Sequence, residues 1–130
     1  MNYENILVEY ENSVATIILN RPNVMNALNS QMRAELTDAV TRYSKEARVV
    51  VLTGSGNAFC SGQDLGDGNS LQSVDLERTL RDEYEPLIRA IVNSPVPTLT
   101  ALNGAAAGAG ANLALAADIV IAKSSAYFVQ

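Results

Sequence analysis

Two stretches rich in small residues carry the chemistry that this sequence can offer, and both would act through backbone N–H groups. The first runs from Asn103 to Asp118 and consists mostly of alanine and glycine. Such small residues leave the peptide groups uncovered, so a ligand can approach them closely. The first turn of a helix adds unpaired N–H donors and a partial positive charge, which together suit an oxygen anion. The stretch therefore predicts an oxyanion site at the head of a helix.

The second stretch, residues 52–65, also passes from an apolar run into a glycine-containing loop. We expect it to supply the other half of the anion site. Nucleotide binding is the competing interpretation, because Gly54-Ser-Gly56 and Gly108-Ala-Gly110 are glycine pairs that follow strand-like segments. Neither pair completes the dinucleotide fingerprint, and neither is followed by the Gly-Lys-Ser/Thr of a phosphate loop. A nucleotide-binding α/β module is therefore the less favoured alternative.

Few side chains in these stretches could move a proton. Asp64 is a loop carboxylate that could be catalytic, although capping of a turn is the favoured interpretation. Cys60 has no base or cation beside it in the sequence, which favours a buried, inert thiol. Asn112 is expected one turn into the helix, near the anion site, but an amide cannot act as a general base. Tyr84 is expected in the core, with a cleft-lining role as the alternative. The neighbouring Glu77, Glu83 and Glu85 are expected on a solvated helix face, interleaved with Arg78, Arg81 and Arg89.

The composition excludes several classes of function. The 130 residues suggest one domain or less, and the net charge of −5 without a basic stripe disfavours nucleic acid as a partner. The absence of histidine excludes a Ser-His-Asp mechanism and a His-ligated zinc site. The single cysteine excludes an internal disulfide, and no apolar segment approaches the length of a membrane span. We expect a cytoplasmic protein with no metal, no membrane and no nucleic-acid partner.

The elements that must position these stretches alternate between strands and helices. This α/β order predicts parallel pairing with crossover helices. Leu76 and Leu80 are placed on the apolar side of the second helix, within which Pro86 should produce a kink or a break. The predicted elements are strands at 6–10 and 14–19 joined by a hairpin turn, a helix from Asn29 or Ser30 to about Lys45, a strand covered on both faces at 49–52, a helix at 74–93, a strand at 96–102, the alanine-rich helix, and strands at 119–122 and 127–130.

Taken together, three stretches of the chain resemble the enoyl-CoA hydratase/isomerase (crotonase) family. They are residues 21–28, 49–65 and 103–122, which occur in the family's order and cover nearly the whole chain. The variants at 62–65 (Gly-Gln-Asp-Leu) and 106–115 are most similar to the branch of phenylacetate-pathway ring-epoxide acyl-CoA isomerases. The resemblance implies a spiral of ββα units, of which this chain would be the N-terminal part of the core. It also implies homotrimers, often paired into hexamers.

The same resemblance implies an acyl-CoA thioester as substrate, with no separate cofactor. The thioester enolate would be stabilised by an oxyanion hole made of the backbone N–H groups of Gln63 and Ala109, where Ala109 replaces the glycine of most members. The residues implied in substrate binding are Val24, Met25, Ala27, Ser61, Asp64 and Leu65 along the coenzyme A, with Gly108 and Asn112 beside the anion site.

The sequence departs from the family in its acid and base groups. The first glutamate of the hydratases falls on Asn112, and the second, like the aspartate of the isomerase branch, would lie beyond Gln130. Family members are about twice as long, so residues 1–130 are interpreted as a single partial domain whose C-terminal half is missing. The leading hypothesis is a parent isomerase or lyase of fatty acid or phenylacetate degradation. The alternative is a non-catalytic truncated fragment that binds coenzyme A weakly or only self-associates.

Overall fold

The computed structural model describes residues 2–64 and 73–129, and for residues 73–75 it describes only the backbone. After an initial hairpin, helical segments alternate with pairs of strands, whereas the sequence predicts single strands between the helices. The elements are β1 (Ile6–Glu11), β2 (Val14–Leu19), the 3₁₀ turn η1 (Pro22–Val24), α1 (Ser30–Tyr43), β3 (Val49–Gly54), β4 (Ala58–Cys60), α2 (Ser73–Thr79), the π-helix η2 (Leu80–Tyr84), α3 (Glu85–Val92), β5 (Thr98–Leu102), β6 (Ala105–Ala107), α4 (Ala109–Leu115), β7 (Ile119–Ala122) and β8 (Phe128–Val129).

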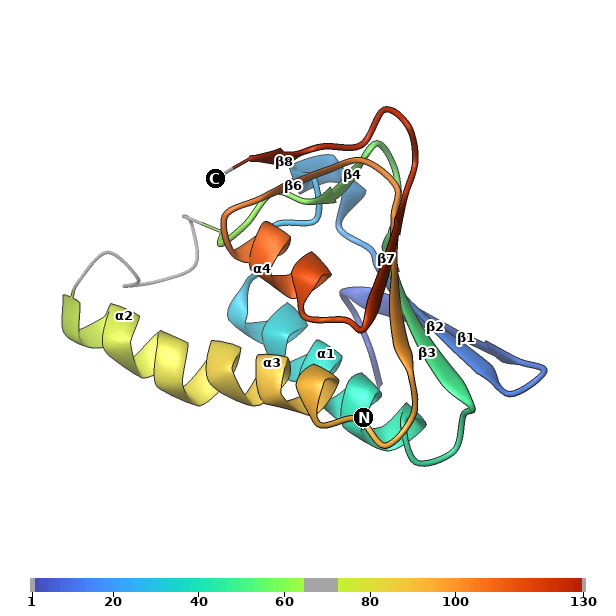
Figure 1. The fold of residues 1–130 in the computed structure, drawn as a ribbon. Coiled ribbons are helices and arrows are strands. Elements are labelled where there is room, and N and C mark those ends of the chain that lie inside the picture. Colours follow the sequence, from blue (N-terminus) through green and yellow to red (C-terminus); the bar gives the residue numbers. More distant parts are fainter. Residues whose placement is uncertain (1, 65–72, 130) are drawn as a thin grey trace.

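The strands form two sheets, a five-stranded one in the order β1-β2-β3-β5-β7 and a three-stranded one in the order β4-β6-β8. Among the described residues, β1 and β2 pair antiparallel and the other strand pairs are parallel. The successive strand pairs β3–β4, β5–β6 and β7–β8 each place one strand in each sheet, and a helical segment follows the first two pairs. In Figure 1 the helices α1, α3 and α4 lie on one side of the large sheet, and the small sheet lies across its end. This arrangement confirms the α/β class and the spiral of ββα units.

The first strand pair is a tight hairpin. Asn12 and Ser13 form its turn, with φ angles of 54° and 64°. Two central residues with positive φ match the right-handed twist of the flanking strands, which fixes the register of the pair. Glu11 therefore faces Val14, and the pairing continues to the other end of both strands. The alternate residues of β2 that follow are buried against the helices.

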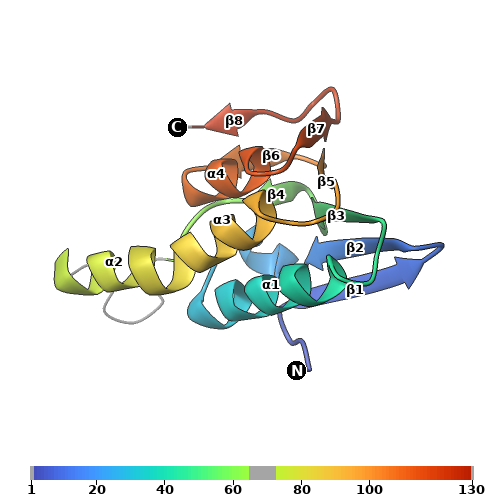
Figure 2. The same cartoon turned by 60° about the horizontal axis from the view of Figure 1, so that its bottom comes forward.

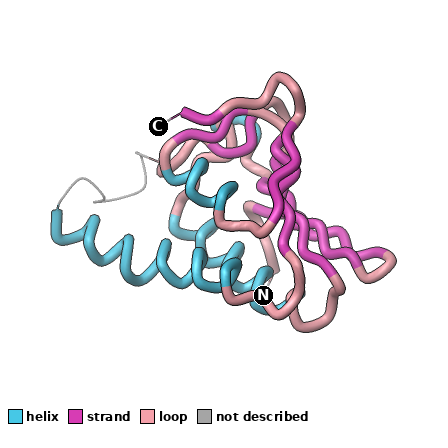
Figure 3. Tube along the Cα trace, in the orientation of Figure 1, coloured by secondary structure: helices cyan, strands magenta, loops and turns pink. Residues whose placement is uncertain are grey.

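Helix α1 begins where the sequence predicts. The side chain of Asn29 caps it by accepting a hydrogen bond from the backbone N–H of Met32 at 2.8 Å. One face of the helix is fully buried, with Met32, Leu36, Ala39 and Val40 in the core. Figure 3 shows this helix beside the strands that it covers. Within the described part of the chain, no helix combines the length and the apolar character needed to cross a membrane.

Three features of the sheets differ from the sequence-based expectation. The strand at 49–52 is not covered on both faces: Val50 and Leu52 are buried, whereas Val49 and Val51 are half-buried. The short strands β4 and β6 were not predicted at all. Each has three residues, all of them alanine in β6, so neither shows a strand periodicity. They become strands only because they pair with each other in the second sheet.

The helical segment 73–92 contains a π-helical turn, η2, immediately before Pro86. The backbone N–H of Glu85 donates to the carbonyl of Leu80, five residues back, and Pro86 then opens α3 without needing a donor of its own. The predicted interruption is thus confirmed as a change of helix type. Leu76 and Leu80, expected on the apolar side of this helix, are exposed, with exposed fractions of 41% and 51%. Figures 1 and 2 show the reason: α2 projects away from α1, the helix against which α3 packs.

Candidate functional site

A cavity of about 130 Å³ lies between the helical segment η2–α3, the head of α4 and the loop that follows β4. Both predicted backbone donors line it, so the fold brings together two residues that are distant in sequence. Asn112, predicted beside the anion site, also lines it. The full lining is Leu28, Gln63, Leu80, Tyr84, Leu87, Ile88, Ala109, Asn112 and Leu113. None of these residues is a carboxylate or another general base.

The local pairing of Gln63 determines which way its backbone N–H points. Leu28 donates its N–H to the carbonyl of Gly62 at 2.7 Å and accepts from the N–H of Asp64 at 2.9 Å. These bonds form a parallel bridge between Leu28 and Gln63. In such a bridge the central residue turns its own N–H and C=O away from the partner. The N–H of Gln63 therefore points away from Leu28, and among the described residues it donates to no protein acceptor.

Ala109 is the first residue of α4, where backbone N–H groups have no partner within the helix. The preceding Gly108 has φ 53° and ψ −122°, a conformation that residues with a Cβ rarely adopt. Gly108 also donates its N–H to the carbonyl of Val129 at 3.1 Å, which fixes the head of the helix to β8. Among the described residues, no hydrogen bond uses the N–H of Ala109.

The two donor segments lie directly against each other. A Cβ placed on Gly62 would be 3.0 Å from the carbonyl oxygen of Ala107 and 3.9 Å from the backbone nitrogen of Ala109. Gly62 has φ +109°, so both its conformation and its surroundings favour glycine. Two residues whose backbone N–H groups take part in no described hydrogen bond thus line one cavity.

The residues predicted to contact coenzyme A are also brought together. Ser61 donates its N–H to the carbonyl of Met25 at 2.9 Å and its hydroxyl to the carbonyl of Val24 at 3.3 Å. Val24 and Met25 are exposed, whereas Ala27 is buried. The segments 24–27 and 61–64 therefore form one continuous surface. Their contact with coenzyme A stays a prediction, and Leu65 lies outside the described residues.

Capping of a turn or of the following segment by Asp64 stays a prediction, because the next residues lie outside the described part of the chain. The carboxylate of Asp64 forms an ion pair with the guanidinium of Arg21 at 3.1 Å. Arg21 in turn donates a hydrogen bond to the carbonyl of Ala27. Asp64 thus connects the two segments of the predicted coenzyme A surface.

Two asparagines that sequence reasoning did not place in the site hold its backbone framework. The buried Asn26 has φ 58° and donates its side-chain amide to the carbonyls of Ser55 and Ala58, both at 3.0 Å. Asn103 donates to the same carbonyl of Ala58 at 3.0 Å and accepts from the N–H of Gly54 at 3.0 Å. Because asparagine tolerates the left-handed region and can bond to backbone groups, its position in the turn after Pro22 was the available signal for Asn26.

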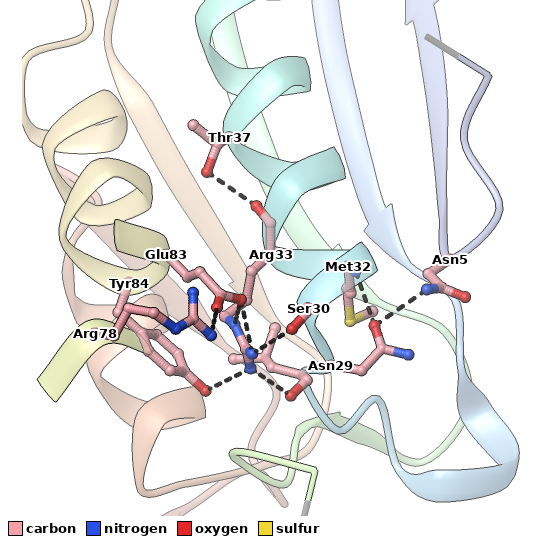
Figure 4. Close-up of polar contacts among 10 residues, drawn as sticks. Asn5, Asn29, Ser30, Met32, Arg33, Thr37, Arg78, Glu83 and Tyr84 are labelled. Carbon is pink, nitrogen blue, oxygen red and sulfur yellow. Dashed lines mark hydrogen bonds and ion pairs between the residues drawn. The ribbon is translucent and has the colours of Figure 1, made fainter. Parts of the chain in front are cut away.

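The opposite side of the cavity depends on Arg33, which sequence reasoning also missed. Its side chain leaves α1 and is only 2% exposed. The guanidinium donates to a carboxylate oxygen of Glu83 at 2.9 Å, to the carbonyl of Leu28 at 2.8 Å and to the hydroxyl of Tyr84 at 3.2 Å. It also lies 4.8 Å from the centre of the Tyr84 ring. Figure 4 shows these groups converging between α1 and the π-helix.

The expectation of a solvated helix face is wrong for Glu83 and confirmed for its neighbours. Glu83 is 16% exposed because it faces the buried Arg33, and its second carboxylate oxygen pairs with Arg78 at 3.1 Å. The partner lies 50 positions away, so no helical spacing could reveal it. The other two glutamates lie in exposed pairs one helical turn from their arginines: Glu77 with Arg81 and Glu85 with Arg89.

Burial and charge determine the protonation of the groups around the cavity. Burial alone would lower the pKa of Arg33, but Tyr84 and Glu83 more than compensate, so its pKa is raised. Burial raises the pKa of the Tyr84 phenol, while the neighbouring guanidinium acts in the opposite direction. Burial also raises the pKa of Cys60 to about 11, which agrees with the expected inert thiol. At neutral pH the site therefore holds a charged Arg33, a neutral phenol and a neutral thiol.

The sequence is similar to proteins of one family along almost its whole length. The family described as "Enoyl-CoA hydratase/isomerase" matches residues 9–130. A protein of Rhodobacter capsulatus named "Probable enoyl-CoA hydratase" is 62% identical over 130 residues, which cover all of this chain and 50% of the relative. The 1,2-epoxyphenylacetyl-CoA isomerase of Escherichia coli is 44% identical over 132 residues, covering 98% of this chain and 50% of that protein.

The fold is similar to solved structures of proteins with related names. The crystal structure of enoyl-CoA hydratase from Bacillus anthracis matches with a TM-score of 0.89 and 33% identity, covering 97% of this chain and 50% of that one. The enoyl-CoA hydratase of Mycobacterium smegmatis matches with a TM-score of 0.88 and 32% identity, covering 96% and 50%. The chain thus spans about half the length of the relatives and the solved structures that it matches.

Proposed function

The chain belongs to the enoyl-CoA hydratase/isomerase family, and on this premise we propose that it provides the thioester-binding half of an acyl-CoA enzyme. The backbone N–H groups of Gln63 and Ala109 would receive the thioester carbonyl oxygen and stabilise the enolate formed from it. Because the chain spans about half the length of its relatives, the proposed activity is that of a whole protein of the relatives' length.

One observation carries this proposal: Gln63 and Ala109 line the same cavity, and neither N–H is used by a described protein acceptor. Preorganised donors are most effective in a site from which water is excluded, and most of the other lining residues are apolar. In comparable acyl chemistry one such donor stabilises the transition state by about 2.7–4 kcal/mol. Two donors would therefore supply a large part of the stabilisation that an enolate needs.

The chemistry follows from what the two donors can and cannot do. When the carbon next to the thioester loses a proton, negative charge moves to the carbonyl oxygen, where the N–H groups would neutralise it. The donors do not themselves remove or return the proton. The described cavity contains no general base, so proton transfer must come from a group outside its present lining. We therefore propose enolate stabilisation as the role of this chain and leave the acid and base to the rest of the protein.

The relatives' names cover both hydratases and an epoxide isomerase, and the proposal includes both reaction types. The trimeric or hexameric assembly, the cytoplasmic location and the degradation pathway stay predictions from the resemblance. Similarity to named enzymes along the whole chain weighs against the alternative of a non-catalytic fragment. It also weighs against the nucleotide-binding module.

A pair of ligands tests whether the carbonyl is recognised. Butyryl-CoA carries the thioester oxygen, whereas S-butyl-CoA is the corresponding thioether and has no oxygen to accept the two hydrogen bonds. Calorimetric titration should show tighter binding of butyryl-CoA by about tenfold, because each net hydrogen bond contributes about 0.5–1.5 kcal/mol. Equal affinities would contradict the proposed role of Gln63 and Ala109. The thioether shares the coenzyme A portion and so controls for the rest of the contact.

A further inference from the structure

The hydroxyl group of Tyr84 has an unused hydrogen-bonding function at the cavity. Its oxygen accepts a hydrogen bond from Arg33 at 3.2 Å. Among the described residues, no acceptor receives its hydrogen. A hydroxyl hydrogen rotates to suit its surroundings, and it turns away from a cationic donor that already occupies the oxygen. Tyr84 therefore holds one free O–H donor in a cavity whose other side chains are mostly apolar.

We propose that Tyr84 is a specificity-determining residue whose O–H donates a hydrogen bond to an oxygen atom on the acyl group of the substrate. This inference rests on the proposed function, because it assumes that the acyl group enters the cavity beside Gln63 and Ala109. It names a substrate class: acyl-CoA thioesters that carry an oxygen acceptor on the acyl chain, in preference to plain hydrocarbon chains of the same length.

The surroundings of Tyr84 hold its phenol in one place. One nitrogen of Arg33, Nη1, donates both to the phenol oxygen at 3.2 Å and to the carbonyl of Leu28 at 2.8 Å. Leu28 is bridged to Gln63, so one guanidinium connects the phenol with the loop that carries a predicted backbone donor. Glu83 fixes that guanidinium by accepting from it at 2.9 Å. Arg33 thus acts as a positioning residue for Tyr84 (Figure 4).

A hydrogen-bond donor in a fixed position within an apolar cavity discriminates between ligands that carry an acceptor and ligands that do not. A ligand oxygen that accepts from Tyr84 satisfies a donor that a hydrocarbon chain would leave unpaired. Sites built to hydrogen-bond a substrate group reject the analogue that lacks it. Because the cavity is small, about 130 Å³, the acyl group has little freedom to avoid the phenol.

The test uses the whole protein and two pairs of isosteric ligands, in each of which an ether oxygen replaces one CH₂ group. The pairs are ethoxyacetyl-CoA with pentanoyl-CoA, and 4-methoxybutyryl-CoA with hexanoyl-CoA. An ether oxygen can only accept, so its preference reports a protein donor. Calorimetry should show at least one ether binding about fivefold more tightly than its hydrocarbon partner, as expected of one net hydrogen bond. Tyr84→Phe should abolish that preference, so that the ether and the hydrocarbon of each pair bind to the variant with affinities within about twofold of each other.

The control is Tyr43→Phe, which removes a phenol hydroxyl from the end of α1, away from the cavity lining, and should retain the preference. No preference in either pair, or a preference that persists in Tyr84→Phe, would overturn the inference while leaving the proposed function intact. Failure of the unmodified protein to bind any of the four ligands would overturn the proposed function and this inference with it.

Discussion

The cavity has two walls that are built in different ways. One, here called the backbone wall, consists of residues 62–64 and 108–109 and presents N–H groups of Gln63 and Ala109. The other, the side-chain wall, consists of Tyr84 with Arg33 and Glu83 behind it. The backbone wall needs small residues and particular φ angles, whereas the side-chain wall needs a buried charge and its partners.

Because the two walls are built differently, amino-acid substitutions should affect them differently. Peptide groups of the backbone wall are fixed by the strand bridge of Leu28 and by the bond from Gly108 to Val129. They remain in place whatever the side chains are, provided that the conformation is kept. The side-chain wall depends on a compensated charge, and removal of Arg33 or Glu83 takes from the other the ion-pair partner that compensates its burial. We therefore expect the side-chain wall to be more sensitive in stability and the backbone wall to be more sensitive in activity.

The largest loss of stability is expected from Arg33→Met. The substitution keeps an unbranched side chain but leaves Glu83 and the carbonyl of Leu28 without the guanidinium. Breaking one partner of a buried ion pair costs about 3–5 kcal/mol, which urea unfolding followed by circular dichroism would measure. The matched control is Arg89→Met, which breaks the exposed pair with Glu85 and should cost less than about 1 kcal/mol. Similar losses in the two variants would contradict the importance of burial.

Gly108→Pro should have the largest effect on activity. Proline fixes φ near −65° and has no N–H, whereas Gly108 has φ 53° and donates to Val129. The head of α4 would move and withdraw the Ala109 donor, which should lower kcat by about 10²–10³. Turnover of an acyl-CoA by the whole protein gives the measurement. Gly108→Ala is the milder comparison, because it strains φ but keeps the N–H. An unchanged kcat in the proline variant would show that the Ala109 donor does not act.

The asparagine that supports the backbone wall should contribute less. Asn26→Ala removes the bonds to Ser55 and Ala58 and places alanine at φ 58°. Ala58 keeps its bond from Asn103, so we expect a loss of about 1–3 kcal/mol in the free energy of unfolding. Asn23→Ala, in the exposed 3₁₀ turn nearby, serves as the control and should change little. If both variants unfold at the same urea concentration, Asn26 does not hold the loop.

The smallest effect is expected outside both walls. Asn29→Ala removes the cap of α1 and should cost about 1 kcal/mol, the usual value for such a cap. Asn29→Asp keeps an acceptor for the N–H of Met32 and should restore most of the loss. If Asn29→Ala lowers the free energy of unfolding by more than Asn26→Ala does, the ranking is wrong. The start of α1, which carries Arg33, would then be important for the side-chain wall.

The backbone wall was largely predictable from the sequence. The strand at 14–19 and the cap at Asn29 follow from local patterns, and β2 and α1 occur as expected. The small residues around 108–110 indicated an anion site at a helix start before any resemblance was considered. The resemblance then added Gln63 and Ala109 by position, and the structure places both at one cavity. The binding of an anion by these two residues stays a prediction.

The side-chain wall could not be predicted in the same way. The pairing of Arg33 with Glu83 joins residues 50 positions apart, and nothing in the pattern of either helix indicates a buried partner. Similarly, the spacing of Leu76 predicts packing, but only the position of α2 relative to the sheet shows that this side chain is exposed. Strand β4 depends on its partner β6, because three residues cannot establish a periodicity. Each of these features is a property of tertiary pairing rather than of the local sequence.

The hydrogen bond from Asn103 to the carbonyl of Ala58, which that carbonyl accepts beside the one from Asn26, has a consequence for the chemical ageing of the protein. Asn103 precedes Gly104, and asparagine is among the residues that are lost on prolonged heating. In the folded chain its amide is fully engaged, accepting from Gly54 and donating to Gly56 and Ala58. Deamidation would replace the amide NH₂ by a carboxylate oxygen, which would then face two carbonyl oxygens with no hydrogen to offer. The loop at Asn103 would then lose its hydrogen bonds to Gly56 and Ala58. The extent of deamidation at Asn103 would therefore increase with the age of a preparation.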